Sequence, residues 1–165
     1  MPSVLQAKGL TALAAGNYMS LFQISSLLGV LAVSAWFGRS GNRPLFSVII
    51  SALMFAGVAG IWLSSAAWAW FWVILAGIGG SATFSMVLML FALRTDNSSE
   101  AAALSGMAQA VGYSIAILGP LGMGMLYDAT GSWTAAMAVL SSLLAAECVL
   151  AWWVAQPKTL GEYRK

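Results

Sequence analysis

The stretch that decides the fold is residues 66–93, which read AAWAWFWVILAGIGGSATFSMVLMLFAL and contain no charged side chain. As an α-helix this stretch would extend about 42 Å, enough to cross the roughly 30 Å hydrocarbon core of a bilayer. A helix is expected because lipid offers no hydrogen-bonding partner to an unpaired backbone group. Alternating polar and apolar segments of about ten residues, typical of membrane β-barrels, are absent. Residues 66–93 therefore predict a membrane-spanning helix.

Four further apolar stretches are each bounded by charges, by proline and glycine, or by polar clusters; they are residues 12–37, 45–63, 101–127 and 133–155. Only 7% of the chain is charged and 61% is hydrophobic, whereas a soluble domain carries about 25% charged residues. We therefore predict an all-α integral membrane protein with about five transmembrane helices, organised as a single transmembrane domain over residues 1–165. The opening residues, Met1 to Leu10, are expected to form a loop.

The basic residues predict how these spans are oriented. With five spans, the segments that follow the first, third and fifth share one side of the membrane. That side holds six of the seven lysines and arginines, and only Lys8 lies opposite. Because basic loops remain in the cytoplasm, the N-terminus is predicted outside and the C-terminus in the cytoplasm. The predicted location is the inner (plasma) membrane of the cell.

Several function classes are disfavoured by what the sequence lacks. The chain has no histidine, and its one cysteine, Cys148, lies in an apolar run. The commonest general base and the commonest metal ligand are therefore missing, and no disulfide can form within the chain. A net charge of +2 without a dense basic cluster argues against a nucleic-acid partner. We predict no enzyme activity, no cofactor and no metal site.

The fourth span carries the most informative polar residues. Gln109 and Tyr113 lie one helical turn apart, so their polar groups share a face. An amide inside a bilayer needs a partner, which leaves two interpretations for Gln109: a solute pocket, or a hydrogen bond between helices. Gly119-Pro120 removes a backbone donor and should kink the helix. The kink could be a gating hinge or only a packing shape.

The third and first spans supply further candidates. Gly77, Ser81 and Ser85 recur every four residues, which suits close packing of small residues against another helix. Alternatively, Ser81 and Ser85 offer hydroxyls to a solute, with Phe84 as a wall. Gln23 lies near the middle of the first span and has the same two interpretations.

Glu147 is the one carboxylate within a predicted span. A carboxylate at this depth is a functional candidate by default, for example as a proton carrier. It lies only about eight residues from the inner end of its span, however. A side chain there could also reach the interface or pair with a neighbour.

Four short motifs, in this order and spacing, resemble the C-terminal half of a major facilitator superfamily transporter, and more closely the cyanate and 2-nitroimidazole porter branch. They are Leu93-Arg94-Thr95, the block from Leu104 to Tyr113, Gly119-Pro120, and the block from Asp128 to Trp133. The resemblance covers nearly the whole chain. It implies helices 8 to 12 of a twelve-helix carrier, that is, a partial C-terminal six-helix bundle. Gly38 to Arg43 resembles a superfamily loop more weakly, because it lacks that loop's acidic residue.

The resemblance also implies which helices line the central cavity of the carrier. It places Gln23, Ser81, Ser85, Gln109 and Tyr113 on cavity-lining helices, and Glu147 on a peripheral one. The expected function is transport of a small polar or anionic solute, cyanate-like or nitroimidazole-like, by alternating access. Phe84 and Tyr113 would close over the solute.

The expected partners are the lipid bilayer, the solute, and a missing N-terminal half or second chain. The alternative is a non-transporting membrane subunit, or a truncated remnant of such a carrier. Flux through liposomes that contain the purified chain would separate transport from the subunit interpretation.

Overall fold

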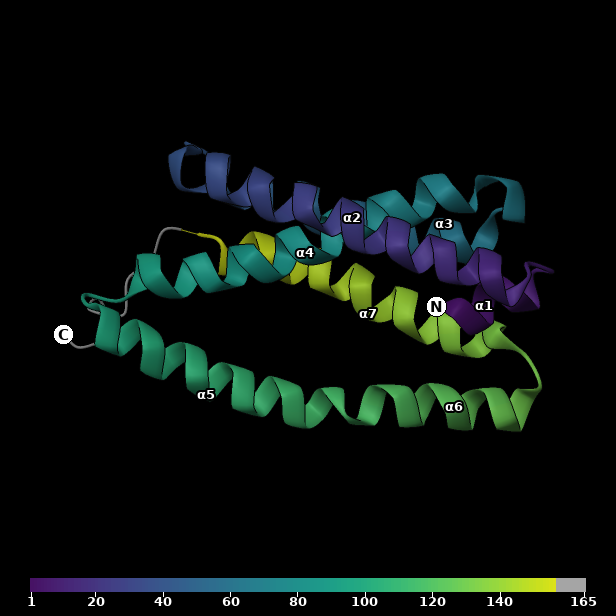
Figure 1. Ribbon diagram of the computed structural model, residues 1–165. Coiled ribbons are helices and arrows are strands. Elements are labelled where there is room, and N and C mark those ends of the chain that lie inside the picture. Colours follow the sequence, from purple (N-terminus) through teal and green to yellow (C-terminus); the bar gives the residue numbers. More distant parts are fainter. Residues whose placement is uncertain (157–165) are drawn as a thin grey trace.

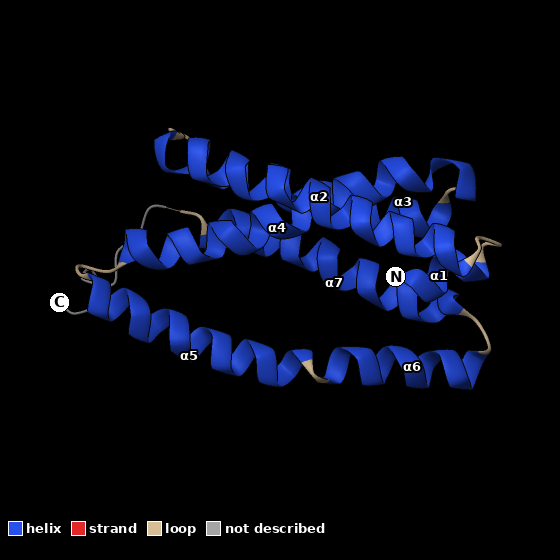
Figure 2. Ribbon diagram, in the orientation of Figure 1, coloured by secondary structure: helices blue, strands red, loops and turns tan. Residues whose placement is uncertain are grey.

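The computed structural model describes residues 1–156, and nearly all of them are helical (Figure 1, Figure 2). Five helical segments are long and apolar enough to cross a membrane, and the described part of the chain contains no strand. The predicted all-α fold with five spans is confirmed. The α-helices are α1 (Pro2–Ala7), α2 (Ala12–Trp36), α3 (Arg43–Leu63), α4 (Ala69–Arg94), α5 (Ser98–Ala116), α6 (Leu118–Thr130) and α7 (Trp133–Val154), with short 3-10 turns at Phe37–Arg39 and Ala66–Trp68.

Most of the long helices have a polar residue at the N-cap position. In each case an oxygen accepts a hydrogen bond from a first-turn backbone N–H that has no partner within the helix. The capping residues are Thr11 for α2, Asn42 for α3, Asn97 for α5 and Ser132 for α7. At the other end of α6, Gly131 adopts a left-handed conformation with φ of 64°. A glycine suits this position because it carries no Cβ. The chain can therefore turn sharply from α6 into α7.

The helices α2, α3, α4 and α7 form the packed part of the molecule, with α3 and α4 in close contact (Figure 1). Small residues explain how near the backbones come. A Cβ on Gly57 would lie 2.7 Å from the Cα of Ala76, and a Cβ on Gly79 would lie 2.7 Å from the Cα of Met54. Neither distance leaves room for a side chain. Glycine at both positions therefore lets α3 and α4 approach backbone to backbone.

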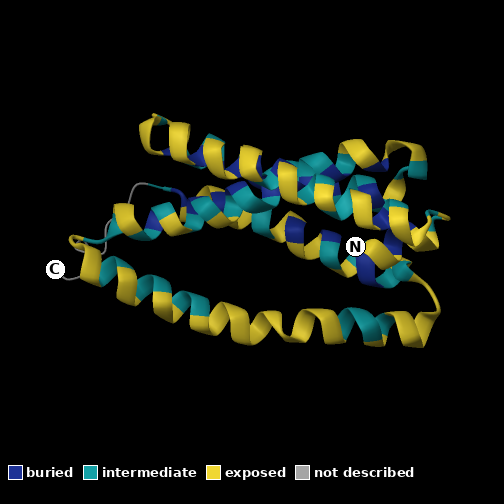
Figure 3. Cartoon of the chain, in the orientation of Figure 1, coloured by how far each residue is buried: buried dark blue, intermediate teal, exposed yellow. Residues whose placement is uncertain are grey.

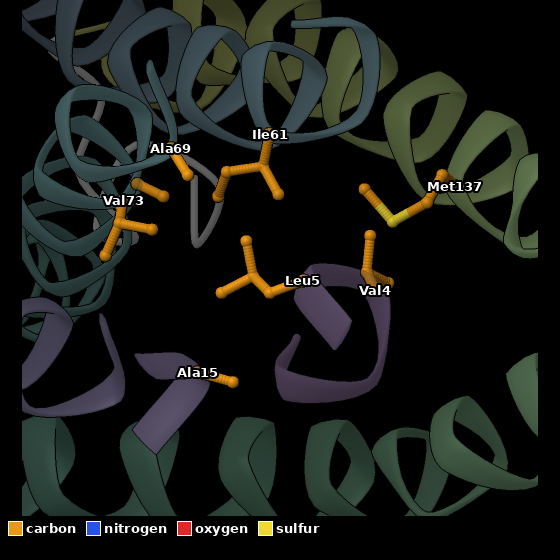
Figure 4. Packing of buried hydrophobic residues seen from close by; sticks show 8 residues of the cluster. Val4, Leu5, Ala15, Ile61, Ala69, Val73 and Met137 are labelled. Carbon is orange, nitrogen blue, oxygen red and sulfur yellow. The ribbon is translucent and has the colours of Figure 1, made fainter. Parts of the chain in front are cut away.

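The expected loop at Met1 to Leu10 is wrong, because Pro2–Ala7 forms the short helix α1. Proline in the first turn is already fixed at a helical φ. Val4 and Leu5 point into a buried cluster (Figure 4), and its other buried members are Ala15, Ile61, Ala69, Val73, Ala76 and Met137. A helix of six residues is too short to show a hydrophobic period, so the sequence pattern did not reveal it.

Lys8 follows α1 and fastens it to the end of α3. Its Nζ donates hydrogen bonds to the carbonyl oxygens of Trp62, at 2.7 Å, and Ser64. Carbonyls at a helix C-terminus have no partner within the helix, and a cation there also faces the negative end of the helix dipole. Partial burial lowers the pKa of the Lys8 ammonium. The one basic residue predicted to lie opposite the others therefore has a structural role at the end of α3.

Candidate functional site

A groove of about 270 Å³ between α4 and α5 brings together three of the predicted site residues, Phe84, Gln109 and Tyr113. It also includes Val87, Leu88, Phe91, Ala108, Gly112 and Ala116. Phe84 is 50% exposed and Tyr113 is 58% exposed, so neither ring is covered by the described residues. The groove thus has an apolar lining, aromatic rings on both sides, and one amide and one phenol as its polar groups.

The Gln109 amide is oriented by its own helix. Its Nε2 donates a hydrogen bond to Ser105 Oγ, one turn earlier on α5, at 2.7 Å. Within the described residues the structure therefore shows a bond inside α5 at this amide, and the choice between a solute pocket and a bond to another helix stays open. Each amide nitrogen carries two hydrogens and each amide oxygen two lone pairs. Gln109 therefore keeps hydrogen-bonding capacity beyond this one bond.

Ser81 lies in a different place, between α2 and α4. Its hydroxyl is 2.7 Å from the carbonyl oxygen of Ser26 on α2, and 2.9 Å from that of Gly77 on its own helix. A Cβ on Gly77 would lie 2.6 Å from the carbonyl oxygen of Phe22. Gly77 and Ser81 therefore occupy the close-packing role that small residues favour. The structure does not bring Ser81 to the α4–α5 groove.

The two remaining solute candidates also lie outside the groove lining. Ser85 is half-buried on α4, and Gln23 is exposed on α2. Of the six residues that the sequence proposed for a solute site, the structure thus gathers three and leaves three apart. What distinguishes the two sets is which neighbouring helix each side chain faces. Spacing along one helix cannot supply that information.

The helix that contains Gly119-Pro120 is interrupted, as proline predicts. α5 ends at Ala116 and α6 begins at Leu118. Proline has no N–H, so Pro120 cannot donate to the carbonyl of Ala116 four residues earlier. Gly119 and Pro120 also line a second cavity, of about 580 Å³, among α1, α2, α3, α4, α6 and α7.

This second cavity is lined mainly by apolar side chains, such as Phe22, Met54, Val58 and Met137. No sequence pattern predicted this cavity. Its lining comes from six helices spread over the chain, and no local motif marks such a convergence. Its lining contains no amide, hydroxyl or carboxyl side chain, whereas the α4–α5 groove includes the Gln109 amide and the Tyr113 hydroxyl.

Arg94, part of the Leu93-Arg94-Thr95 motif, links the C-terminal end of α4 to the C-terminal end of α7. Its Nη2 donates hydrogen bonds to the carbonyl oxygens of Val154, at the end of α7, and of Gln156, at 3.1 Å. Basic side chains commonly satisfy helix C-terminal carbonyls in this way. From the sequence, Arg94 contributes only to the predicted orientation and to the resemblance. Its partners lie about 60 residues away in the sequence. No local spacing predicts a contact over that separation.

Comparison with curated proteins finds transporters. The chain is 33% identical over 144 residues to the uncharacterized transporter YycB of Bacillus subtilis, covering 87% of the chain and 36% of that protein. It is 32% identical over 148 residues to the 2-nitroimidazole transporter of Escherichia coli, covering 88% of the chain and 37% of that protein. A putative anionic 4-hydroxy-benzoate permease of Thauera aromatica is 46% identical over 83 residues, which are 48% of the chain and 51% of the permease.

No family model and no solved structure matches the chain. The chain spans little more than a third of the length of the first two relatives, 36% and 37%. This partial coverage is consistent with the C-terminal half of a transporter, as the resemblance predicts. The relatives are named as transporters or permeases, which fits the prediction that the chain is not an enzyme. The chain is therefore a multi-pass membrane protein homologous to a segment of membrane transporters.

Proposed function

We propose that this chain is the C-terminal part of a major facilitator superfamily carrier of the cyanate and 2-nitroimidazole branch, and that the carrier moves a small polar or anionic solute by alternating access. The observation that carries the proposal is the α4–α5 groove, which holds Phe84, Gln109 and Tyr113 together. In the proposed carrier residues 1–165 form one transmembrane domain in the inner membrane. The N-terminus lies outside and the C-terminus lies in the cytoplasm.

The groove chemistry favours a flat solute with a polar edge. Phe84 and Tyr113 offer ring faces, and stacked or edge-to-face ring contacts contribute about 0.5–1.5 kcal/mol each beyond area burial. The Gln109 amide and the Tyr113 hydroxyl can both donate hydrogen bonds to a nitro or carboxylate oxygen. Two of the relatives are named for 2-nitroimidazole and for an anionic 4-hydroxy-benzoate. Both compounds are small planar rings with such oxygens, so a nitroimidazole-like solute is the preferred probe, and the smaller cyanate ion comes next.

The remaining part of the carrier would cover α5 and α6. Neither helix has a buried residue within the described chain (Figure 3), although polar solutes are bound in cavities that protein encloses. An N-terminal half, packed against α5, would close the groove from the open side. The break at Ile117, with Gly119 and Pro120 beside it, would let α5 and α6 bend as hinged halves during the transport cycle.

The test is uptake of radiolabelled 2-nitroimidazole by a complete carrier that contains this segment. Gln109→Leu should lower uptake about tenfold, because one hydrogen bond to a charged or strongly polar group is worth about 1.5 kcal/mol. Met107→Ala is the matched control, since Met107 lies on α5, is 64% exposed and does not line the groove. Equal uptake by the wild type and a well-inserted Gln109→Leu variant would remove Gln109 from the solute site.

The second candidate is a non-transporting membrane subunit, or a remnant of a carrier, which uses its open helices to bind another chain. The exposed span Ser98–Thr130, with none of its most apolar window buried, favours it. Liposomes that contain the purified chain separate the two. Saturable solute flux, by the chain alone or after an N-terminal half of a related carrier is added, supports transport, and the absence of flux in both preparations supports the non-transporting interpretation.

A further inference from the structure

Glu147 lies in the interface between α3 and α7, where it meets a serine of the other helix. Ser51 Oγ on α3 donates a hydrogen bond to Glu147 Oε1 at 3.0 Å. Ser51 is fully buried and Glu147 is half-buried. The second carboxyl oxygen, Oε2, is buried and has no hydrogen-bond partner among the described residues. The side chain therefore points into the helix interface and does not extend toward the membrane surface.

The depth of Glu147 along α7 follows from helix geometry. It lies seven residues before Val154 and fourteen after Trp133, or about 10 Å from one end of α7 and about 21 Å from the other. The nearer end is the one where Arg94 binds the last carbonyls of α7. Water can therefore reach the carboxyl most directly from that end of the bundle.

Among the described residues, no charged or titratable group provides Glu147 with a counter-ion. Within the described part of the chain, its carboxyl group makes the bond to Ser51 and no ion pair. The charged and titratable groups that the structure describes on α3, α4, α6 and α7, apart from Glu147 itself, are Cys148 beside it, Arg43 at the start of α3, Arg94 at the end of α4, and Tyr127 and Asp128 near the end of α6. A carboxylate without a cation is costly inside a bilayer, whereas a neutral acid with one unpaired O–H costs far less.

We propose that Glu147, held by Ser51 between α3 and α7, is a proton-binding site within the membrane. Oε1 accepts the Ser51 hydrogen bond, and the proton resides on the buried Oε2. Loss of the proton places an unpaired negative charge in the α3–α7 interface. That charge draws water into the interface from the end near Arg94, or separates the two helices. The ligand of this site is a proton, so no bond other than O–H forms or breaks.

The test is infrared spectroscopy of the full chain in lipid nanodiscs near neutral pH. A protonated carboxylic acid has a C=O stretch separate from the amide and carboxylate bands. The wild type should show this band and Glu147→Gln should lose it, while Glu100→Gln, at the start of α5, should keep it. Ser51→Ala should shift the band to higher wavenumber, because the carbonyl loses its hydrogen bond. Identical spectra for the wild type and Glu147→Gln, both with helical circular dichroism, would overturn the proposal.

A consequence for transport rests on the proposed function: movement of the solute would be coupled to movement of a proton. In a complete carrier, Glu147→Gln should then abolish accumulation driven by a pH gradient but leave solute exchange at equal pH intact. Loss of both activities, or of neither, would contradict coupling at Glu147. The infrared band requires no transport. It therefore tests the proton site even if the chain is not part of a working carrier.

Discussion

The α3–α4 pair and the α5–α6 pair both contain several glycines and use them in opposite ways. In α3 and α4, Gly57 and Gly79 lie against backbone atoms of the facing helix. In α5 and α6, a Cβ added to any of the five glycines (106, 112, 119, 122 and 124) would meet no atom of the described residues within 4 Å. Glycine content alone therefore does not identify a packing face. The five glycines of α5 and α6 thus take part in no close helix contact within the described chain.

The largest expected effect comes from filling the α3–α4 contact. Gly79→Leu should destabilise the packed helices by about 3 kcal/mol, because the new side chain meets the Met54 backbone. Gly106→Leu on α5 is the matched control and should change stability by about 0.5 kcal/mol or less. Unfolding in mixed micelles, followed by circular dichroism, measures both. A similar loss in the two variants would mean that α5 is packed as tightly as α4.

A smaller effect is expected at the α2–α4 contact. Ser81→Ala removes the hydroxyl that reaches the Ser26 carbonyl, and should cost about 1 kcal/mol in the same unfolding measurement. Ser114→Ala on α5 is the control, because its hydroxyl bonds only to the Ala110 carbonyl of its own helix. If Ser81→Ala instead impaired solute uptake by a complete carrier without altering stability, Ser81 would belong to the solute site and not to packing.

The smallest effect on stability, but a clear one on shape, is expected at the break between α5 and α6. Pro120→Ala restores an N–H that can donate to the Ala116 carbonyl, and should join the two helices. Stability should change by only about 0.5 kcal/mol, because neither helix has a buried residue. Spin labels at positions 103 and 129, in a Cys148→Ser background, should move apart. Pro44→Ala, in the first turn of α3, is the control and should leave the distance between the labels unchanged. If Pro120→Ala also leaves this distance unchanged, proline is not the cause of the break.

The parts of the fold that depend on length and composition were predictable from the sequence. The five spans follow from apolar stretches long enough to cross a bilayer, and the interruption near Pro120 follows from a missing donor. The site was predictable only in part. Gln109 and Tyr113 share a face by helical spacing, but spacing could not tell Ser81 in a helix contact from Phe84 in a groove. The bonds from Arg94 to α7 and from Ser51 to Glu147 join residues about 60 and 96 positions apart. No local pattern encodes such pairs.

The hydrogen bonds of Arg94 also restrict how the open helices can move. They hold the end of α4 to the end of α7 where α5 begins. At the opposite end, Tyr127 on α6 stacks on Trp133, the first residue of α7, with ring centroids 4.6 Å apart. The span from Ser98 to Thr130 therefore follows an end of α4 that is bonded to α7, and its other end stacks on the first residue of α7, with the interruption at Ile117 between them. Bending at Ile117 would let this span move toward or away from the other helices while the Tyr127–Trp133 contact stays in place.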